Sequence, residues 1–368
     1  MGTLARMLTS SFATSPVRAV LFADGVFGHL EGKTAHGILR HSTLLEPVAV
    51  VDRAHRPETT AAMVPGTDVP VVDSVTEALR YRPDALVLAM TESDFGESGL
   101  DGFLRDPREP GDIPEFWWDE LERAARAGLH LISCLHQQLR ETPLAGLLAE
   151  GRQIIDVRRP YPTLPKYSGR APRSRARVVH VAGSDCVVGK RTAALQLHRE
   201  ARARGVAAGY VGTGQTCLLT GCATGAIVDR TPVFQAAGLV EHLVQEAEAD
   251  HDLLVIKGQA SVLHPAFGGL ATAILQGSQP DAVVFAHDPG RKARYHWEHL
   301  AVGAVEEEIA LVERLGGAPV VALATKGAES VRQLRHLGLP VADVLDADGP
   351  GVLTDAVQRA LGGPVARR

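Results

Sequence analysis

The chain has 368 residues, a length typical of two domains of ordinary size. Hydrophobic residues make up 45% of it and charged residues 22%, which indicates a large buried core and excludes an intrinsically disordered chain. The formal net charge is −5, so there is no basic footprint for nucleic acid or for an anionic membrane surface. No apolar stretch approaches the roughly 20 residues of a membrane-spanning helix. We therefore expect neither nucleic acid nor membrane among its partners.

The four cysteines, Cys134, Cys186, Cys217 and Cys222, do not form a disulfide framework in a chain of this length. They lie in or beside apolar stretches, as reduced cytosolic cysteines usually do. No histidine or further cysteine pair accompanies Cys217 and Cys222, so we expect no zinc site there. Residues 1–15 carry no apolar core of a signal sequence, and a frayed tail is the simpler interpretation. The expected location is cytoplasmic.

The first part of the chain alternates short apolar runs with helical stretches. Strands are predicted at 17–23, 48–52, 85–90 and 130–134, with helices at 33–41, 74–81 and 114–127. This alternation indicates βαβ units and a parallel sheet, because each parallel strand needs a covering crossover. Shortly after Asp156 comes RRPYPTLPKYSGRAPRSRAR, a proline- and arginine-rich stretch typical of a linker.

A second alternating series follows this linker. Strands are predicted at 178–182, 208–212, 253–256, 282–286, 320–324 and 341–345, with a last helix at 352–361. The predicted fold class is α/β, with two parallel-sheet domains, at 16–160 and 177–363, joined by a linker at 161–176.

The stretch VVHVAGSDCVVGKRT, residues 178–192, is the most informative motif. A buried strand ends at Gly183, a short loop follows, and a helix opens at Gly189 and Lys190. Such a loop makes an anion cradle, because its backbone N–H groups and the helix dipole converge on one point. Lys190 adds a full positive charge where a phosphate chain would sit. The alternative is a strand-to-helix turn that binds nothing.

The motif departs from the usual P-loop in two ways. Five residues, not four, separate the glycines, and Arg191 stands where a Ser or Thr would bind Mg²⁺. The longer spacing resembles the GTDxxVGKT loop of dethiobiotin synthetase. Thr192 lies about 100° further around the helix, which places it poorly for a metal. The residues expected to bind the phosphorylated cofactor are Gly183, Ser184, Asp185, Gly189, Lys190, Arg191 and Thr192.

Polar residues also follow the next three strands of the predicted sheet. Since ligands of open parallel sheets bind at the carboxyl ends of the strands, these residues predict one pocket. For two of them a purely structural role stays open: His264 before Pro265 as a turn cap, and Asp288 before Pro289 as an Asx turn. The strand-end residues are Gln215, Thr216 and Thr220; Lys257, Gln259, Ser261 and His264; and His287, Asp288 and Arg291.

Seven segments in order resemble a bacterial two-domain P-loop family first described only as a domain of unknown function. They are KTAHGILRHS, LHQQL, DVRRP, GSDCVVGKRT, VGTGQT, KGQASVLHP and LQGSQPDAVVFAHDPGR. The characterised branch of the family is D-glutamate N-acetyltransferase, which moves an acetyl group from acetyl-CoA to the amine of D-glutamate. The resemblance implies that the domain at 16–160 is Rossmann-like and that the domain at 177–363 is P-loop NTPase-like. It also implies a small-molecule amino-acid substrate, acetyl-CoA or another acyl-CoA as cofactor, and a homo-oligomer.

The chain departs from these relatives where acids are expected. Lys257-Gly258 replaces a Glu-Gly pair, and Pro232-Val233-Phe234 replaces a VADF-like stretch. With Arg191 beside the P-loop lysine, few acids are left to hold Mg²⁺. We therefore expect no metal, and phosphate binding without metal-assisted phosphoryl transfer.

Acyl transfer from a thioester needs a positioned amine, one general base and donors to the oxyanion. His264 or Asp229 is the candidate base, and Gln215, Gln259 or Ser261 the candidate oxyanion donor. The catalytic candidates are His264, Asp229, Gln259 and Ser261, and Gln215 is counted with the substrate-binding residues. The expected substrate-binding residues are Lys257, Gln215, Thr216, His287, Arg291, Lys33, Arg40 and Arg158.

Two other function classes stay open from the sequence. The loop resembles that of dethiobiotin synthetase and carries Asp185. An ATP-dependent amide ligase or kinase, using ATP with Mg²⁺, is therefore one alternative. The missing acids suggest a non-catalytic ligand-binding protein as a second alternative.

Overall fold

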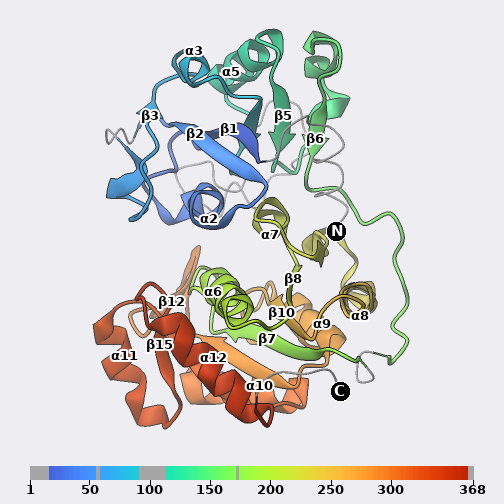
Figure 1. Cartoon of the computed structure of the whole chain (residues 1–368), viewed down its shortest axis with the longest axis vertical. Coiled ribbons are helices and arrows are strands. Elements are labelled where there is room, and N and C mark those ends of the chain that lie inside the picture. Colours follow the sequence, from blue (N-terminus) through green and yellow to red (C-terminus); the bar gives the residue numbers. More distant parts are fainter. Residues whose placement is uncertain (1–15, 55–58, 91–112, 171–173, 364–368) are drawn as a thin grey trace. The chain divides into compact units, whose positions relative to one another are not determined.

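A computed structural model describes residues 16–54, 59–90, 113–170 and 174–363 (Figure 1). The chain divides into two compact units. The N-terminal unit runs up to Arg159 and includes Leu218–Gly221, and the C-terminal unit takes the rest of the chain from Pro160 onward. Each unit is described separately.

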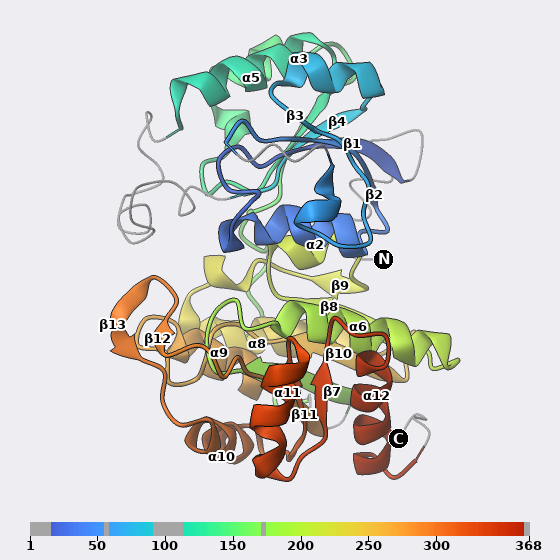
Figure 2. The same cartoon turned by 90° about the vertical axis from the view of Figure 1, so that its left-hand side faces the viewer.

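The N-terminal unit contains a six-stranded sheet whose neighbouring strands are all parallel. Its order, β3-β2-β1-β4-β5-β6, is that of a Rossmann fold. The helices α3 and α5 lie on one face and α2 on the other (Figure 2). The strands are β1 (Val17–Phe22), β2 (Leu45–Val51), β3 (Val71–Val72), β4 (Ala85–Leu88), β5 (His130–Ser133) and β6 (Ile154–Asp156). The helices are α2 (Lys33–His41), α3 (Val75–Ala78) and α5 (Glu115–Arg126), with 3-10 turns η1 (Leu30–Gly32), η2 (Thr60–Ala62), η3 (Leu79–Tyr81), η5 (Leu139–Glu141) and η6 (Pro143–Leu147).

The turn after β1 is closed by a buried carboxylate. Asp52, just after β2, accepts hydrogen bonds from the backbone N–H groups of Gly25, Phe27 and Ala54, at 3.0, 2.9 and 2.8 Å. In dinucleotide-binding Rossmann folds, the amides of this turn face a pyrophosphate. Because Asp52 already accepts from two of them, this turn is not arranged as a nucleotide site.

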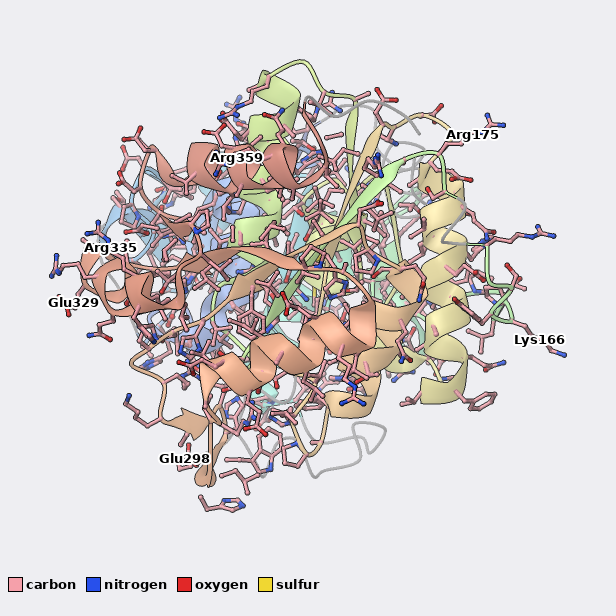
Figure 3. All side chains as sticks on the ribbon, turned by 90° about the horizontal axis from the view of Figure 1, so that it is seen from below. Lys166, Arg175, Glu298, Glu329, Arg335 and Arg359 are labelled. Atoms are coloured by element: carbon pink, nitrogen blue, oxygen red, sulfur yellow. The ribbon has the colours of Figure 1, made fainter. Side chains whose placement is uncertain are left out.

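The C-terminal unit contains a seven-stranded parallel sheet in the order β15-β14-β11-β7-β10-β8-β9. The sheet lies between a layer containing α6 and α12 and a layer containing α8, α9 and α10 (Figure 3). Its strands are β7 (Arg177–Gly183), β8 (Ala208–Gly212), β9 (Thr224–Gly225), β10 (Leu253–Lys257), β11 (Ala282–Ala286), β14 (Val320–Thr325) and β15 (Val341–Asp343). A separate antiparallel hairpin pairs β12 (Ala293–Arg294) with β13 (Trp297–Ala301). The helices are α6 (Lys190–Ala203), α7 (Gln215–Leu219), α8 (Val233–Ala247), α9 (Gly268–Ser278), α10 (Val305–Gly316), α11 (Ala328–Leu334) and α12 (Gly349–Ala360), with η8 (Val228–Arg230) and η9 (Arg335–Leu337).

The central strands of this sheet are buried on both faces. One hydrophobic cluster packs α8 and α9 against β10, with Leu243, Ile256 and Ile274 fully buried. A second packs α10 against β11 and β14, with Phe285 and Leu323 fully buried. Burial of each large apolar side chain contributes about 1.5–3 kcal/mol, which fixes the strand ends that carry the polar residues.

The α/β fold class predicted from the sequence is confirmed. The strands predicted at 208–212 and 282–286 and the helix at 33–41 match β8, β11 and α2 to the residue. The helix predicted at 74–81 is shorter, because α3 ends at Ala78 and the chain continues as η3. The short strands β3, β6 and β9 and the β12–β13 hairpin were not predicted. Within the described residues, the longest apolar helices fall short of what a membrane crossing requires.

Candidate functional site

The loop between β7 and α6 has the backbone of an anion cradle. A Cβ atom on Gly183 would lie 2.6 Å from the carbonyl oxygen of Ala286, so only glycine fits there. Gly189, the N-cap of α6, has φ of 110°, in the region that favours glycine. Val187 between them has φ of 57°, an uncommon conformation for a β-branched residue. Strained backbone of this kind clusters at ligand sites, which makes this loop the primary candidate.

Lys190 places its ammonium inside this loop. The side chain is 5% exposed, and Nζ donates to the backbone oxygen of Asp185. Burial lowers the pKa of Lys190 to about 8, and the positive charge of Lys257 adds to this effect. Arg191 is half-buried and Thr192 buried in the same first turn of α6. The helix N-terminus and Lys190 thus present positive charge to one point.

Lys257 joins this cation cluster from the neighbouring strand. It ends β10, where its Cα is paired with Val181 of β7. Burial lowers the pKa of Lys257, and the charge of Arg191 acts in the same direction. Behind it, His180 is buried, and burial together with Lys257 and Lys190 lowers its pKa to about 3. His180 is therefore neutral at physiological pH, and the charge of the cluster comes from Lys190, Lys257 and Arg191.

The first half of the loop is held by the segment after β11. Asp185 Oδ2 lies 3.3 Å from Arg291 Nη1 and accepts from the backbone N–H of Tyr295 at 2.8 Å. Ser184 Oγ lies 2.7 Å from His287 Nδ1. Ser184 and Asp185 are fully buried. The side chains of Ser184 and Asp185 bind protein groups, and the backbone N–H of Ser184 donates to the carbonyl oxygen of Ala286 at 3.1 Å, so this half of the loop is anchored to the protein.

His264 is oriented by the start of α9. Its Nδ1 accepts from the backbone N–H groups of Ala266 and Phe267, at 3.2 and 3.3 Å. The neutral ring therefore carries its hydrogen on Nε2. Nε2 lies 3.9 Å from Asp185 Oδ1, and neither atom has a hydrogen-bond partner among the described residues. Burial lowers the pKa of His264, which keeps the ring neutral.

Asp185, Cys186 and His264 are close enough to suggest a metal centre. One potential ligand atom from each lies within 4.8 Å of the other two. The neutral ring of His264, however, offers no bare nitrogen, because Nδ1 accepts from two amides and Nε2 carries the hydrogen. Asp185 is already paired with Arg291, and Arg294 lies 4.0 Å away. This donor set fits a metal ion poorly.

Two of the predicted polar residues after β10 bind other protein groups. Gln259 Nε2 donates to the backbone oxygen of Thr213 at 2.6 Å, and Ser261 Oγ donates to the Glu308 carboxylate. Gln215 and Thr216 begin α7 and are buried. Asp229 lies exposed in η8 and acts electrostatically on Lys257.

The remaining predicted residues belong to the N-terminal unit. Lys33 begins α2 and Arg40 lies in its last turn, where burial lowers the pKa of Arg40. Arg158 follows β6 and is 5% exposed. Their part in a substrate site stays a prediction.

Four further residues of the C-terminal unit take part in the site but were not singled out from the sequence. Arg294 and Tyr295 lie on or beside a hairpin that shows no strong strand pattern. Glu308 sits in a Glu-rich first turn of α10, which reads as a solvated helix start. His180 lies inside an apolar strand, where a single histidine is easily taken for a core residue.

Two family models match the chain. Residues 108–160 match the DUF1611 N-terminal domain, described as Rossmann-like, and residues 165–353 match the DUF1611 C-terminal P-loop domain. A crystal structure of a DUF1611 family protein from Anabaena variabilis aligns with a TM-score of 0.81 and 32% identity. That alignment covers 93% of this chain and 99% of that protein.

Two curated relatives match about half of this chain. A D-glutamate N-acetyltransferase from Tritonibacter scottomollicae is 37% identical over 185 residues, covering 49% of this chain and 54% of that protein. A D-glutamate N-acetyltransferase from a Pseudoalteromonas species is 28% identical over 203 residues, covering 55% and 60%. The chain therefore spans a little over half the length of these two relatives. Together with the two family models and the solved relative matched over almost its whole length, these similarities show that the chain belongs to the DUF1611 family, which joins a Rossmann-like domain to a P-loop domain.

Proposed function

We propose that the chain is an N-acyltransferase that moves an acetyl or other acyl group from acyl-CoA to the amine of an amino acid such as D-glutamate. The names of the two curated relatives support the reaction class. The observation that carries the proposal for this chain is the cation cluster at the P-loop. Lys190, Lys257 and Arg191 place their positive charge at a glycine-bounded loop that leads into the N-terminus of α6, and this arrangement suits an anionic ligand.

In this proposal the P-loop is a phosphate cradle. The loop amides, Lys190 and Arg191 would hold phosphates of the acyl donor, and Lys257 would bind either a further phosphate or a substrate carboxylate. Glycine at Gly183 and Gly189 lets the backbone approach the ligand closely. The positive charge of Lys190, Lys257 and Arg191 favours a phosphate over a metal–phosphate complex, because it repels a divalent cation.

The chemistry is attack of the acceptor amine on the thioester carbonyl. A C–N bond forms, the C–S bond breaks, the thiol leaves, and the amine loses one proton to a base. His264 is arranged as a hydrogen-bond donor through Nε2, so of the two candidate bases we assign that role to Asp229. Asp229 is exposed, and its charge raises the pKa of Lys257, the residue proposed to bind a substrate carboxylate.

An ATP-dependent ligase or kinase requires a bound Mg²⁺ to neutralise developing charge. Asp185, the acid that the loop shares with dethiobiotin synthetase, is paired with Arg291 and the backbone of Tyr295. Lys257 stands where such enzymes usually carry a glutamate. The pairing of Asp185 and the lysine at position 257 both favour the acyltransferase over the ATP-dependent alternative.

Thiol release from acetyl-CoA, measured over a panel of D- and L-amino acids with EDTA present, tests the proposal. We expect release with at least one acidic amino acid and a product bearing an N-acetyl group by mass spectrometry. An absence of release with every amine, together with turnover that requires ATP and Mg²⁺, would overturn it.

A further inference from the structure

A buried ion pair lies behind the first half of the P-loop. Arg294 is 4% exposed and Glu308 fully buried. Arg294 Nη1 donates to the backbone oxygen of Ser184 at 2.5 Å, and Nη2 donates to Glu308 Oε1 at 3.2 Å. One guanidinium thus joins the start of the P-loop to a carboxylate of α10.

Glu308 is itself fixed from a third segment. Ser261, in the loop after β10, places its Oγ 2.6 and 2.7 Å from the two carboxylate oxygens. The chain of contacts therefore runs from Ser261 through Glu308 and Arg294 to Ser184. It ties together the ends of β10 and β7, the β12–β13 hairpin and the first turn of α10.

Stability alone does not account for this buried ion pair. Replacing a buried ion pair with apolar residues is often neutral or stabilising, because desolvation offsets much of the attraction. A strained loop such as this one, with Val187 at φ of 57°, persists only when its surroundings hold it. The Ser184 oxygen is one of the points at which the loop is held.

We propose that Arg294 and Glu308 are positioning residues of the phosphate site, which hold the first half of the P-loop in its ligand-binding conformation without touching the ligand. The inference rests on the proposed function, because it takes this loop as the seat of the donor's phosphates. It adds to that function two residues that act on the site through other protein groups.

The pair has a second, electrostatic effect that a purely structural contact would lack. The charged groups that act on Lys190 are Cys186, Lys257, Asp185 and Glu308, and the Glu308 carboxylate raises the pKa of Lys190. Removing this charge should lower the pKa of Lys190 further. The pH above which anion affinity falls should then move down.

The test is calorimetric titration of the full chain with Mg²⁺-free inorganic pyrophosphate and with CoA. We expect Glu308→Gln to weaken pyrophosphate binding at least tenfold and to lower the midpoint of its pH dependence. Arg294→Lys should bind more tightly than Arg294→Met but less tightly than the unchanged protein, because one ammonium cannot span both partners. In these variants the KM for the acceptor amino acid should be the same as in the unchanged protein.

Asp281→Asn is the matched control. Asp281 precedes β11 at the opposite end of the strands, where it accepts from Val178 N at 2.7 Å and from Arg177 at 3.2 Å. The Asp281→Asn variant should be less stable than the unchanged protein and should bind pyrophosphate with the same affinity. If Glu308→Gln does not fold, Ser261→Ala serves instead, since it loosens Glu308 but leaves the ion pair; a several-fold weaker pyrophosphate affinity is expected.

Unchanged affinity in folded Glu308→Gln and Arg294→Met, or an equal loss in Asp281→Asn, would overturn the inference. Absence of pyrophosphate and CoA binding in the unchanged protein would overturn it together with the proposed function. Tight binding without acetyl transfer would contradict only the proposed function, and the positioning role would then be judged on the variants.

Discussion

Lys190, at the start of α6, and Lys257, at the end of β10, lie close enough for their positive charges to repel each other. Burial lowers the pKa of both lysines, and the charge of Lys257 lowers that of Lys190 further. An anion bound between them would relieve this repulsion and raise both pKa values. The site is therefore arranged to gain most from a ligand that carries more than one negative charge.

Lys190→Ala should remove most of the affinity for the phosphorylated donor and leave the fold intact. A charged hydrogen bond contributes about 1.5–3 kcal/mol, or roughly 10- to 150-fold in Kd. Alanine suits the start of α6, since it is a good helix former. Calorimetry with CoA and circular dichroism measure the two effects. Lys166→Ala, which removes a lysine projecting into solvent on the linker (Figure 3), should bind normally; equal loss in both variants would contradict the cradle.

Anion affinity should fall as pH rises through about 8, the pKa of Lys190 without ligand. Binding raises this pKa, so each binding event takes up protons near pH 8. Calorimetry in two buffers of different ionisation enthalpy measures that uptake, which should vanish in Lys190→Met. The stability of the unliganded protein should increase over the pH range in which anion affinity falls. Between pH 8 and 10.5 the unfolded chain binds more protons at this lysine, so the free energy of unfolding rises with pH.

His180 should make the C-terminal unit sensitive to acid. Its pKa is about 3 in the folded protein and near 6.5 in the unfolded chain, so the unfolded chain binds more protons between these values. The free energy of unfolding should then decrease by up to about 1.4 kcal/mol for each pH unit below 6.5. Partly buried His198, with a pKa of about 4, acts in the same direction.

Urea unfolding between pH 4.5 and 7 measures this dependence. His180→Asn should flatten the slope, whereas His299→Gln, at an exposed position of β13, should leave it unchanged. An identical slope in His180→Asn would show that the histidine is not responsible.

Activity should not require Mg²⁺. Lys257 and Arg191 are cations close to the place where a divalent ion would bind, and like charges at a low effective dielectric repel by several kcal/mol. Turnover should be the same with EDTA as with added Mg²⁺. Lys257→Glu should weaken anionic ligands and introduce metal affinity, measurable by titration with Mn²⁺. Full loss of activity in EDTA that Mg²⁺ restores would favour the ATP-dependent alternative.

Much of the architecture follows from the sequence alone. Apolar runs such as 282–286 are buried on both faces of a parallel sheet, so their pattern predicts β11 without tertiary information. Gly183, Gly189 and Lys190 predict an anion loop. The two glycines allow a backbone that other residues rarely adopt, and Lys190 opens a helix whose dipole favours an anion. Short edge strands such as β3 and β9 escape prediction, since two residues carry no periodicity.

The tertiary structure decided which polar side chains face the loop and which bind the protein. From the sequence, Asp185, Ser261 and His264 are equal candidates for ligand contacts. In the folded chain Asp185 pairs with Arg291, Ser261 with Glu308, and His264 caps the start of α9.

Arg294 and Glu308 show the physical reason for this limit. They are 14 residues apart, and nothing in the local pattern of either residue marks it as buried. Their pairing depends on where the β12–β13 hairpin and α10 pack against the end of β7. Local sequence determines elements and the backbone of a glycine loop, whereas the partners of a buried charge are set by long-range packing that no single segment encodes.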